Sequence, residues 1–426
     1  MAYADGARQT TGDGLPREIT KASLAAAFGV WIGFLFGTNA MISSTNSNFL
    51  AVLPDALHVS RTAISGALAA SVWLVAIILP FSGRVMDRFG IRTVILPGAL
   101  LFAACYIGLG QIHTFWQFAA VQVVLALTVA MHGSVGYAKL ISLWFDRNRG
   151  LMLGLCVALG AGVGQTIMPR VSRWMIDSYG WRGGYVGIGL MVLIIAFPLL
   201  FLFARPPAKA ALIDGVPEAV VEKIGMTFGE ALKTRELYLI VFAIMLGSFS
   251  LIGTLQHMVP MLLERHFTPG PATTAISVAF LGVVLGEFTT GFLVDRINSS
   301  KIILPYFVLA LVGVLLVHST TDGNILLAGA LLMGLGLGCE VGLNAYLVSR
   351  YFGLKSFGTL YGLTFGASNF GIGIGIFLMG WLRDLTGSYD VTLWVVGVTM
   401  TLAILCVLLL GPFRYAKGNS LAGVKK

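Results

Sequence analysis

Charged residues are scarce in this chain of 426 residues, since Asp, Glu, Lys and Arg together make up 11% of it. Soluble globular proteins carry roughly 25% of such residues, because a surface in contact with water requires them. Apolar residues make up 57% of the chain, and the mean hydropathy is +0.87. Such a composition suits lipid rather than water. It excludes soluble, disordered, collagen-like and disulfide-scaffold proteins and indicates a membrane protein with many crossings.

Features of enzymes and of metal proteins are also missing. The four cysteines have no metal-ligand spacing and lie inside apolar stretches, where we expect them to pack in the core. The glycine runs 160–164 and 334–338 do not follow strands and lack the lysine of a nucleotide loop, so they predict close helix packing. No nucleophile–base pair is present. We therefore expect no catalytic residues, no metal and no cofactor.

The excess of positive charge does not indicate a nucleic-acid partner. The formal net charge is +9, from 28 basic and 19 acidic residues. A nucleic-acid surface needs basic residues clustered on one face, whereas here they occur singly between apolar runs. The expected partners are the lipid bilayer, a small-molecule substrate and protons, and we expect the chain to act as a monomer.

Twelve apolar runs are long enough to cross about 30 Å of hydrocarbon. They are approximately 22–50, 62–82, 93–112, 117–144, 151–175, 184–204, 238–262, 273–293, 302–318, 324–350, 357–382 and 390–411. The longest gap between them opens with Arg205-Pro206-Pro207, which breaks a helix. We therefore predict a cytoplasmic tail (1–21), an N-terminal six-helix bundle (22–204), a cytoplasmic central loop (205–237), a C-terminal six-helix bundle (238–411) and a cytoplasmic tail (412–426).

Basic residues in the connections predict the orientation. Cytoplasmic loops of membrane proteins collect Lys and Arg. With the amino terminus placed inside, 21 basic residues fall on the cytoplasmic side and six on the outer side. This ratio predicts that both termini are cytoplasmic, and we expect the plasma (inner) membrane as the location.

The two halves of the chain repeat each other in parallel. Matching pairs are Gly83 and Gly291, Asp87 and Asp295, and Arg88 and Arg296 at an offset of 208, and Asp177 and Asp384 at an offset of 207. A transporter that works by alternating access is built from such repeats around a site at the membrane midplane. The predicted fold class is all-α, with twelve membrane helices in two pseudo-symmetric bundles.

The segment Gly83-Arg84-Val85-Met86-Asp87-Arg88-Phe89-Gly90-Ile91-Arg92 resembles the signature between helices 2 and 3 of the major facilitator superfamily. In that family these residues form a latch that holds the cytoplasmic side closed in one state, with partners that differ between states. The resemblance implies a latch formed by Gly83, Asp87, Arg88, Gly90, Arg92, Asp295 and Arg296.

Within that superfamily, helices 4 to 6 are most similar to the monocarboxylate porters and the oxalate–formate exchangers. The similarity rests on Trp144-Phe145-Asp146-Arg147-Asn148-Arg149-Gly150-Leu151 and on Gly180-Trp181-Arg182. In helix 7, Gln256-His257-Met258-Val259-Pro260 also resembles bacterial members of that branch. Carboxylate transporters of this branch usually have an arginine in helix 8, where this chain has Glu287. The lysine of the oxalate exchanger in helix 11 aligns roughly with Ser368. Both cations that would hold an organic anion are therefore missing.

Ionisable residues inside a bilayer cost roughly 2.5–3.5 kcal/mol each on insertion scales, so they usually face a cavity or a partner. Glu287 and Glu340 are the candidate carriers of a coupling proton, because a carboxyl group in a dry cavity can load a proton on one side and release it on the other; a structural role between helices is the alternative. His132 and His257 are candidates for substrate contact or proton relay, or are interhelical hydrogen-bonders. Arg170 either meets an anionic substrate or caps the outer end of its helix.

Polar uncharged residues within the spans are further candidates for the site. Helix 1 carries Thr38-Asn39 and the run from Ser43 to Asn48, which a lipid-facing surface cannot hold cheaply. We therefore predict substrate contacts from Asn39, Ser43 and Asn46. Asn344 in helix 10 and Asn369 in helix 11 are candidates of the same kind.

The expected function is secondary active transport, with proton-coupled uptake of a small organic monocarboxylate. One alternative is a transporter or exporter of a bulkier amphipathic, zwitterionic or cationic solute, which the acidic residues of the spans would suit. Another is a membrane sensor that keeps the fold without transporting, although the latch at 83–92 argues against it.

Overall fold

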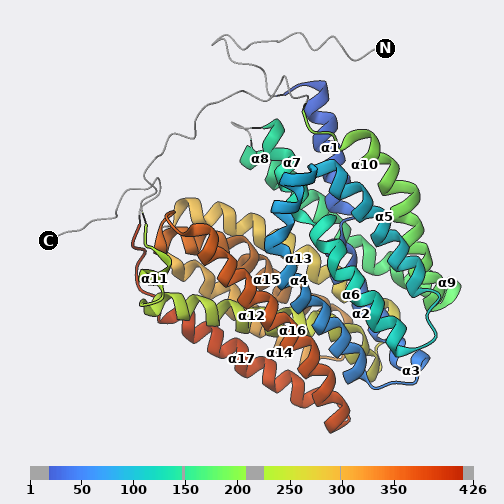
Figure 1. Cartoon of the computed structure of the whole chain (residues 1–426). Coiled ribbons are helices and arrows are strands. Elements are labelled where there is room, and N and C mark those ends of the chain that lie inside the picture. Colours follow the sequence, from blue (N-terminus) through green and yellow to red (C-terminus); the bar gives the residue numbers. More distant parts are fainter. Residues whose placement is uncertain (1–18, 146–148, 208–224, 298, 416–426) are drawn as a thin grey trace, which may run out of the picture.

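The computed structural model of the chain describes residues 19–145, 149–207, 225–297 and 299–415, which are almost entirely helical (Figure 1). The first half contains α1 (Lys21–Leu35), α2 (Thr38–Leu50), α3 (Leu53–Leu57), α4 (Arg61–Phe89), α5 (Ile91–Leu109), α6 (Phe115–Met131), α7 (Ser134–Trp144), α8 (Arg149–Cys156), α9 (Gly162–Met191) and α10 (Phe197–Phe203). The second contains α11 (Phe228–Ala231), α12 (Arg235–Glu264), α13 (Pro269–Arg296), α14 (Ile303–Ser319), α15 (Gly323–Phe352), α16 (Phe357–Thr386) and α17 (Asp390–Leu408).

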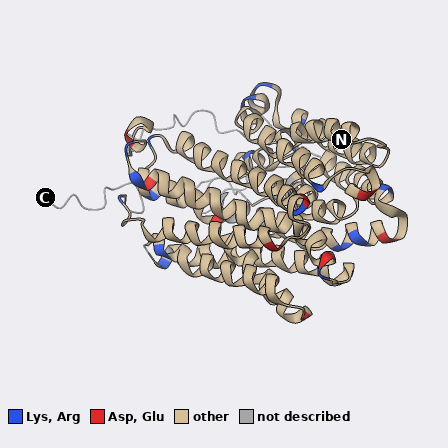
Figure 2. Ribbon diagram, turned by 90° about the horizontal axis from the view of Figure 1, so that it is seen from below, with Lys and Arg blue, Asp and Glu red and all other residues tan. Residues whose placement is uncertain are grey.

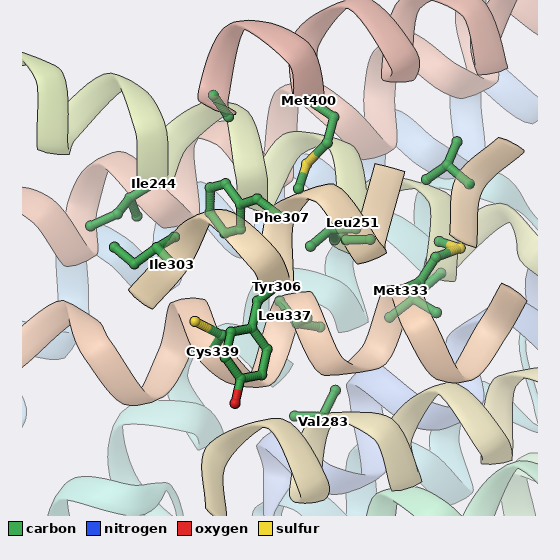
Figure 3. Packing of buried hydrophobic residues seen from close by; sticks show 14 of the residues in the cluster. Ile244, Leu251, Val283, Ile303, Tyr306, Phe307, Met333, Leu337, Cys339 and Met400 are labelled. Carbon is green, nitrogen blue, oxygen red and sulfur yellow. The ribbon is translucent and has the colours of Figure 1, made fainter. Parts of the chain in front are cut away.

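The helices form two bundles, each with its own hydrophobic core. One cluster of buried apolar side chains comes from residues 231–410, and the other from residues 27–204 together with Ile376. Between the bundles, α4 packs against α16, α9 against α13, and α2 against α12. Figure 3 shows part of the C-terminal core, where Ile244, Phe307, Cys339 and Met400 come together from four different helices.

Eleven helical segments of the described residues are long and apolar enough to cross a membrane. One of them, Met152–Phe203, has 52 residues. At 1.5 Å per residue it would be roughly 78 Å long, more than twice the thickness of the hydrocarbon. Gly180 divides it, because its φ of 71° and ψ of 172° are not helical. The segment therefore crosses twice, which gives the twelve crossings that the sequence predicts.

Polar side chains at the ends of the apolar runs fix where helices begin. Thr114 and Gln117 form a capping box at the start of α6, and the Asp322 carboxylate accepts the backbone N–H groups of Asn324 and Ile325 at the start of α15. Such caps satisfy N–H groups that have no partner within the helix. Figure 2 shows the charged residues mainly near the ends of the helices, which leaves long uncharged stretches between them.

Two of the predicted membrane helices are broken near their middle. The predicted span 22–50 is divided into α1 and α2 at Phe36-Gly37, and the span 117–144 into α6 and α7 at His132-Gly133. Irregular backbone at membrane depth is tolerated where it is buried in protein. The two breaks are neighbours, since the Thr38 hydroxyl donates to the carbonyl oxygen of His132 at 3.4 Å.

Glycines bring α13 and α15 into backbone contact. A Cβ atom on Gly334 would lie 2.9 Å from the Cα of Gly282 and closer still to the carbonyl oxygen of Ala279. A Cβ atom on Gly338 would lie 2.9 Å from the backbone nitrogen of Glu287. Small residues allow membrane helices to approach in this way. The glycine run 334–338 thus packs helices, as its sequence predicts.

We expect Gly334→Ala to destabilise the protein by about 1–3 kcal/mol, the usual cost of overpacking. The added methyl group has no room unless α13 and α15 move apart. Gly397→Ala in α17 is the matched control, because a Cβ atom there would meet no atom within 4 Å. Thermal unfolding in detergent should show a lower midpoint for Gly334→Ala only. Equal midpoints for the two variants would contradict the close packing of these helices.

Candidate functional site

The two ends of the molecule differ in how closely the bundles approach. We call the end where α1 begins the α1 end, and the opposite end, which carries α3, the α3 end. On α4, the indole N–H of Trp73 donates to the carbonyl oxygen of Phe370 at 3.3 Å. One turn closer to the α1 end, Ile77 is 66% exposed. A Cβ atom on Gly83 or Gly362 would meet no atom within 4 Å. The facing surfaces of α4 and α16 therefore separate toward the α1 end.

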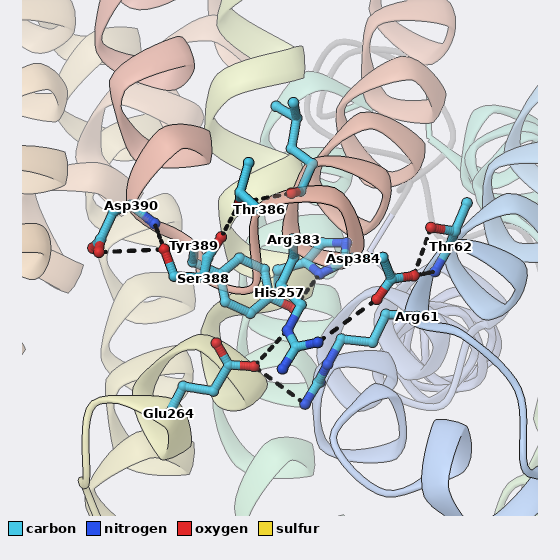
Figure 4. Close-up of polar contacts among 11 residues, drawn as sticks. Arg61, Thr62, His257, Glu264, Arg383, Asp384, Thr386, Ser388, Tyr389 and Asp390 are labelled. Carbon is cyan, nitrogen blue, oxygen red and sulfur yellow. Dashed lines mark hydrogen bonds and ion pairs between the residues drawn. The ribbon is translucent and has the colours of Figure 1, made fainter.

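A charged cluster joins the bundles at the α3 end (Figure 4). The Glu264 carboxylate, at the end of α12, accepts a hydrogen bond from Nε of Arg383 at 2.8 Å. The same oxygen lies 3.4 Å from the guanidinium of Arg61, which begins α4 in the other bundle. One carboxylate thus holds an arginine from each bundle. We call Arg61, Thr62, Glu264, Arg383 and Asp384 the α3-end lock.

Within the α3-end lock, Asp384 caps a helix of the opposite bundle. Its Oδ2 accepts the backbone N–H of Thr62 at 2.7 Å and the Thr62 hydroxyl at 2.6 Å. Thr62 lies in the first turn of α4, where N–H groups lack helical partners and the helix dipole favours a negative charge. Ser60 caps the next free group, the N–H of Ala63, at 3.1 Å.

His257 lies behind the α3-end lock and is held by three neighbours. Its Nδ1 is 3.0 Å from the Tyr389 hydroxyl, and its Nε2 is 2.9 Å from the carbonyl oxygen of Ile376. The Ser65 hydroxyl of the other bundle lies 3.4 Å from Nε2. A carbonyl oxygen can only accept, so Nε2 carries a proton. This arrangement matches the interhelical alternative for His257, and its contact with substrate remains a prediction.

The polar run of α2 also crosses between the bundles near the α3 end. The Asn48 amide donates to the Pro169 carbonyl oxygen at 2.8 Å and accepts from the Thr273 hydroxyl of α13 at 2.9 Å. The Ser47 hydroxyl accepts the backbone N–H of Val259 in α12 at 3.0 Å. A substantial part of this run is therefore used to seal the α3 end.

Ser43 and Asn46, two candidates for substrate contact, lie further toward the middle of the molecule. Ser43 is half-buried and its hydroxyl accepts the Gln165 amide at 3.3 Å, while the Gln256 amide approaches the Ser43 carbonyl oxygen at 3.5 Å. Asn46 is 8% exposed. The third candidate of this helix, Asn39, has a side chain that lies outside the described residues. Helices α2, α9 and α12 thus bring together amides and hydroxyls from both bundles.

His132 lies at the break between α6 and α7 and is fully buried. Its Nδ1 is hydrogen-bonded to the Tyr137 hydroxyl at 2.6 Å. Its Nε2 has no hydrogen-bond partner among the described residues. His132 and Glu340 are 208 residues apart, the offset of the repeat, and each lies inside its own bundle next to a hydroxyl group.

Glu340 is buried inside the C-terminal bundle beside a serine pair. The Ser248 hydroxyl of α12 donates to Oε1 of Glu340 and lies 2.7 Å from the Ser368 hydroxyl of α16. Oε2 has no hydrogen-bond partner among the described residues and faces Gly247. The other side chains lining the small cavity beside Glu340 are apolar. An ionised carboxylate without a cation costs several kcal/mol when buried, so this site suits a carboxyl group that takes up a proton.

The remaining polar candidates have simpler surroundings. Asn344, one turn after Glu340, accepts the Thr364 hydroxyl at 2.7 Å, and the Asn369 amide donates to the Phe365 carbonyl oxygen of its own helix at 2.9 Å. Glu287 is half-buried on α13, and Arg170 is exposed on α9. Neither Glu287 nor Arg170 makes a hydrogen bond or ion pair with another residue in the described part of the chain. Their roles remain predictions.

The latch residues lie at the α1 end, where the bundles are apart. Gly90 has a φ of +89° at the turn between α4 and α5. The Arg88 guanidinium lies 5.5 Å from the Phe89 ring centroid, Arg92 donates to the Phe201 carbonyl oxygen at 2.6 Å, and Arg296 lies over the Phe292 ring. These contacts stay within one bundle. The side chains of Asp87 and Asp295 lie outside the described residues, so the latch remains a prediction.

The α3-end lock and the serine pair were not predicted from the sequence. Arg61 and Arg383 are two of the six basic residues expected on the outer side, and Asp384 was identified only as the repeat partner of Asp177. Asp177, the repeat partner of Asp384 in the first half, pairs with Arg173 within its own helix. The one available signal was an acidic residue repeated at the α3 end of two equivalent helices, but nothing local indicated its partner.

Comparisons with known proteins agree with this architecture. The Major Facilitator Superfamily profile matches residues 32–274 and 237–425. The MFS-type transporter YcxA of Bacillus subtilis is 24% identical over 84% of this chain and 87% of its own length. Human monocarboxylate transporter 11 is 24% identical over 86% of this chain and 77% of its own.

A third relative matches a smaller part. Multidrug resistance protein MdtG of Dickeya zeae is 30% identical over 41% of this chain and 43% of its own length. The superfamily match covers nearly the whole chain, and the described residues form eleven apolar helical segments, one of which is long enough to cross twice. The chain is a multi-pass membrane transporter that belongs to the Major Facilitator Superfamily.

Proposed function

We propose that this transporter takes up a small organic carboxylate together with protons by alternating access. The observation that carries the proposal is Glu340, a carboxyl group deep in the membrane that shares the Ser248 hydroxyl with Ser368 on the adjacent helix. A group that gains and loses a proton between two states can couple proton flow to movement of a solute. Glu287 is the second candidate carrier. Similarity to a monocarboxylate transporter supports the solute class.

We further propose that the α1 end faces the cytoplasm. The 21 basic residues assigned to that side against six on the other support this orientation, in which both termini are cytoplasmic and the protein lies in the plasma (inner) membrane. In this orientation the structure is the state open to the cytoplasm, with the α3-end lock closing the outer side. We propose a monomer as the working unit and transport rather than catalysis as the activity.

A second candidate function is transport or export of a bulkier amphipathic or cationic solute. Two observations favour it: Glu287 stands where carboxylate transporters of the branch have an arginine, and one relative is a multidrug resistance protein. In this alternative an acidic site would attract the cation directly.

The experiment is proton flux into proteoliposomes as carboxylates, amines and zwitterions are added one at a time. A proton signal with a carboxylate supports the first proposal. A signal with amines or bulky amphipathic compounds only would replace it with the second. No signal with any of them would contradict proton coupling.

Asp87→Asn should slow transport while leaving expression and substrate binding largely intact. The expected reason is that the latch stabilises the state closed at the α1 end, so its loss affects the exchange between states rather than the binding site. Transport rate and binding are measured on the same preparation. Binding that falls in parallel with transport would refute the latch assignment.

A further inference from the structure

Ser248 and Ser368 connect Glu340 to a half-buried position on α16. Ser248 is 1% exposed and donates to Glu340, whereas Ser368 is half-buried and lies 2.7 Å from Ser248. A hydroxyl group can donate one hydrogen bond and accept others. The three groups therefore form an unbroken hydrogen-bonded chain from a buried carboxyl group to a more accessible hydroxyl.

These hydrogen-bonded groups lie on the side of α12 that faces the N-terminal bundle. Ser248 precedes Val259 by eleven residues, which is about three helical turns and returns to the same face. The backbone N–H of Val259 donates to Ser47 of the other bundle. Toward the α1 end the bundles separate, and the half-buried Ser368 is the most accessible of the three groups. The cavity on the other side of Glu340 is lined by apolar side chains of α12, α14, α15 and α17, which offer no second polar path among the described residues.

We propose that Ser248 and Ser368 relay the coupling proton between Glu340 and the opening between the bundles. A proton taken up at the Ser368 hydroxyl oxygen releases the proton already there to Ser248, and Ser248 passes its own to Oε1 of Glu340. Each hydroxyl gains one proton and gives one, so both stay neutral while the carboxylate becomes a carboxylic acid. Release follows the same steps in reverse. The relay rests on the proposed function, because it assumes that Glu340 carries the proton.

The test compares Ser248→Ala and Ser368→Ala in proteoliposomes that contain the full chain. Two rates are measured for a solute that gives a proton signal: net uptake with its protons, and exchange of labelled for unlabelled solute without a pH gradient. Net uptake requires Glu340 to change its protonation, whereas exchange does not. We expect each variant to slow net uptake at least about tenfold more than exchange. Ser368→Thr, which keeps the hydroxyl group, should restore net uptake.

Ser250→Ala is the matched control. Ser250 is also buried on α12, but its hydroxyl donates to the Leu246 carbonyl oxygen and pairs with Thr399 of α17, away from Glu340. Its loss should affect neither rate selectively. Equal slowing of net uptake and exchange by Ser248→Ala would mean a structural role and overturn the relay.

The outcomes separate the relay from the proposed function. If Glu340→Gln loses proton coupling while both alanine variants keep the native rate of net uptake, the relay fails and the proposed function stands. If the native protein moves no protons with any solute, or Glu340→Gln keeps proton coupling, the assumption beneath the relay fails and the relay with it.

Discussion

Replacing Glu340 by glutamine is expected to abolish the accumulation of solute that a pH gradient drives. Glutamine keeps the size of the side chain and can still hydrogen-bond Ser248, but it cannot take up or release a proton. One pH unit corresponds to about 1.4 kcal/mol, enough for about a tenfold concentration ratio when one proton accompanies each solute. The expected loss is therefore about tenfold per pH unit. It is measured as the steady-state ratio of labelled solute across proteoliposomes with an acidic exterior.

Two controls accompany this result: exchange of labelled solute by Glu340→Gln, and accumulation by Glu287→Gln. A neutral glutamine resembles the protonated acid, so Glu340→Gln should retain measurable exchange of labelled solute, which shows that the variant is folded and binds. Glu287→Gln tests the second candidate under the same gradient. Accumulation that survives Glu340→Gln but is lost in Glu287→Gln would make Glu287 the carrier.

Asp384→Ala should shift the protein toward the state that is open at the α3 end. The carboxylate makes two hydrogen bonds to Thr62 of the other bundle, and hydrogen bonds to a charged group contribute about 1.5–3 kcal/mol. The Asp384 side chain is 23% exposed, which weakens them. We therefore expect the ratio of open to closed molecules to rise about tenfold. Ser47→Cys, buried between α2 and α12, should then react faster with a membrane-impermeant maleimide by a similar factor.

The repeat supplies a matched control for this experiment. Asp177 occupies the equivalent position of the first half, but it pairs with Arg173 one turn away in the same helix. Asp177→Ala should therefore leave the labelling rate of Ser47→Cys unchanged. If both aspartate variants accelerate labelling equally, Asp384 does not act by joining the bundles.

The fold could be predicted from the sequence because its largest signals are local. Lipid solvation requires about twenty apolar residues for each crossing, and the basic loops and the repeat then organise the crossings into two halves. Boundaries were less accurate. The expected loop between 175 and 184 is a single glycine turn at Gly180, since Asp177 and Arg173 form an ion pair one helical turn apart and keep this polar stretch helical.

The site was predictable only where a residue is unusual by itself. A glutamate or a run of hydroxyls and amides within a membrane helix stands out in the sequence, which is how Glu340 and Ser43 were found. The α3-end lock joins residues near 61, 264 and 384, whose charges look ordinary at the ends of membrane helices. Ser248 and Ser368 are common residues in such helices, and only their contact across α12 and α16 gives them significance.

The α3-end lock also shows where the two repeated halves of the chain differ. At the offset of 208, Arg61 and Thr62 correspond to Pro269 and Gly270. Proline has no N–H group and glycine has no hydroxyl, so the start of α13 lacks both the cation and the side-chain donor that the start of α4 offers. Asp177 therefore has no equivalent cation or hydroxyl donor at the start of α13 to bind. Among the described residues, a carboxylate joins α4 to α16, whereas the equivalent carboxylate of α9 pairs within its own helix and does not reach α13. A change of salt concentration on that side should therefore affect the interface between α4 and α16 more than the interface between α9 and α13.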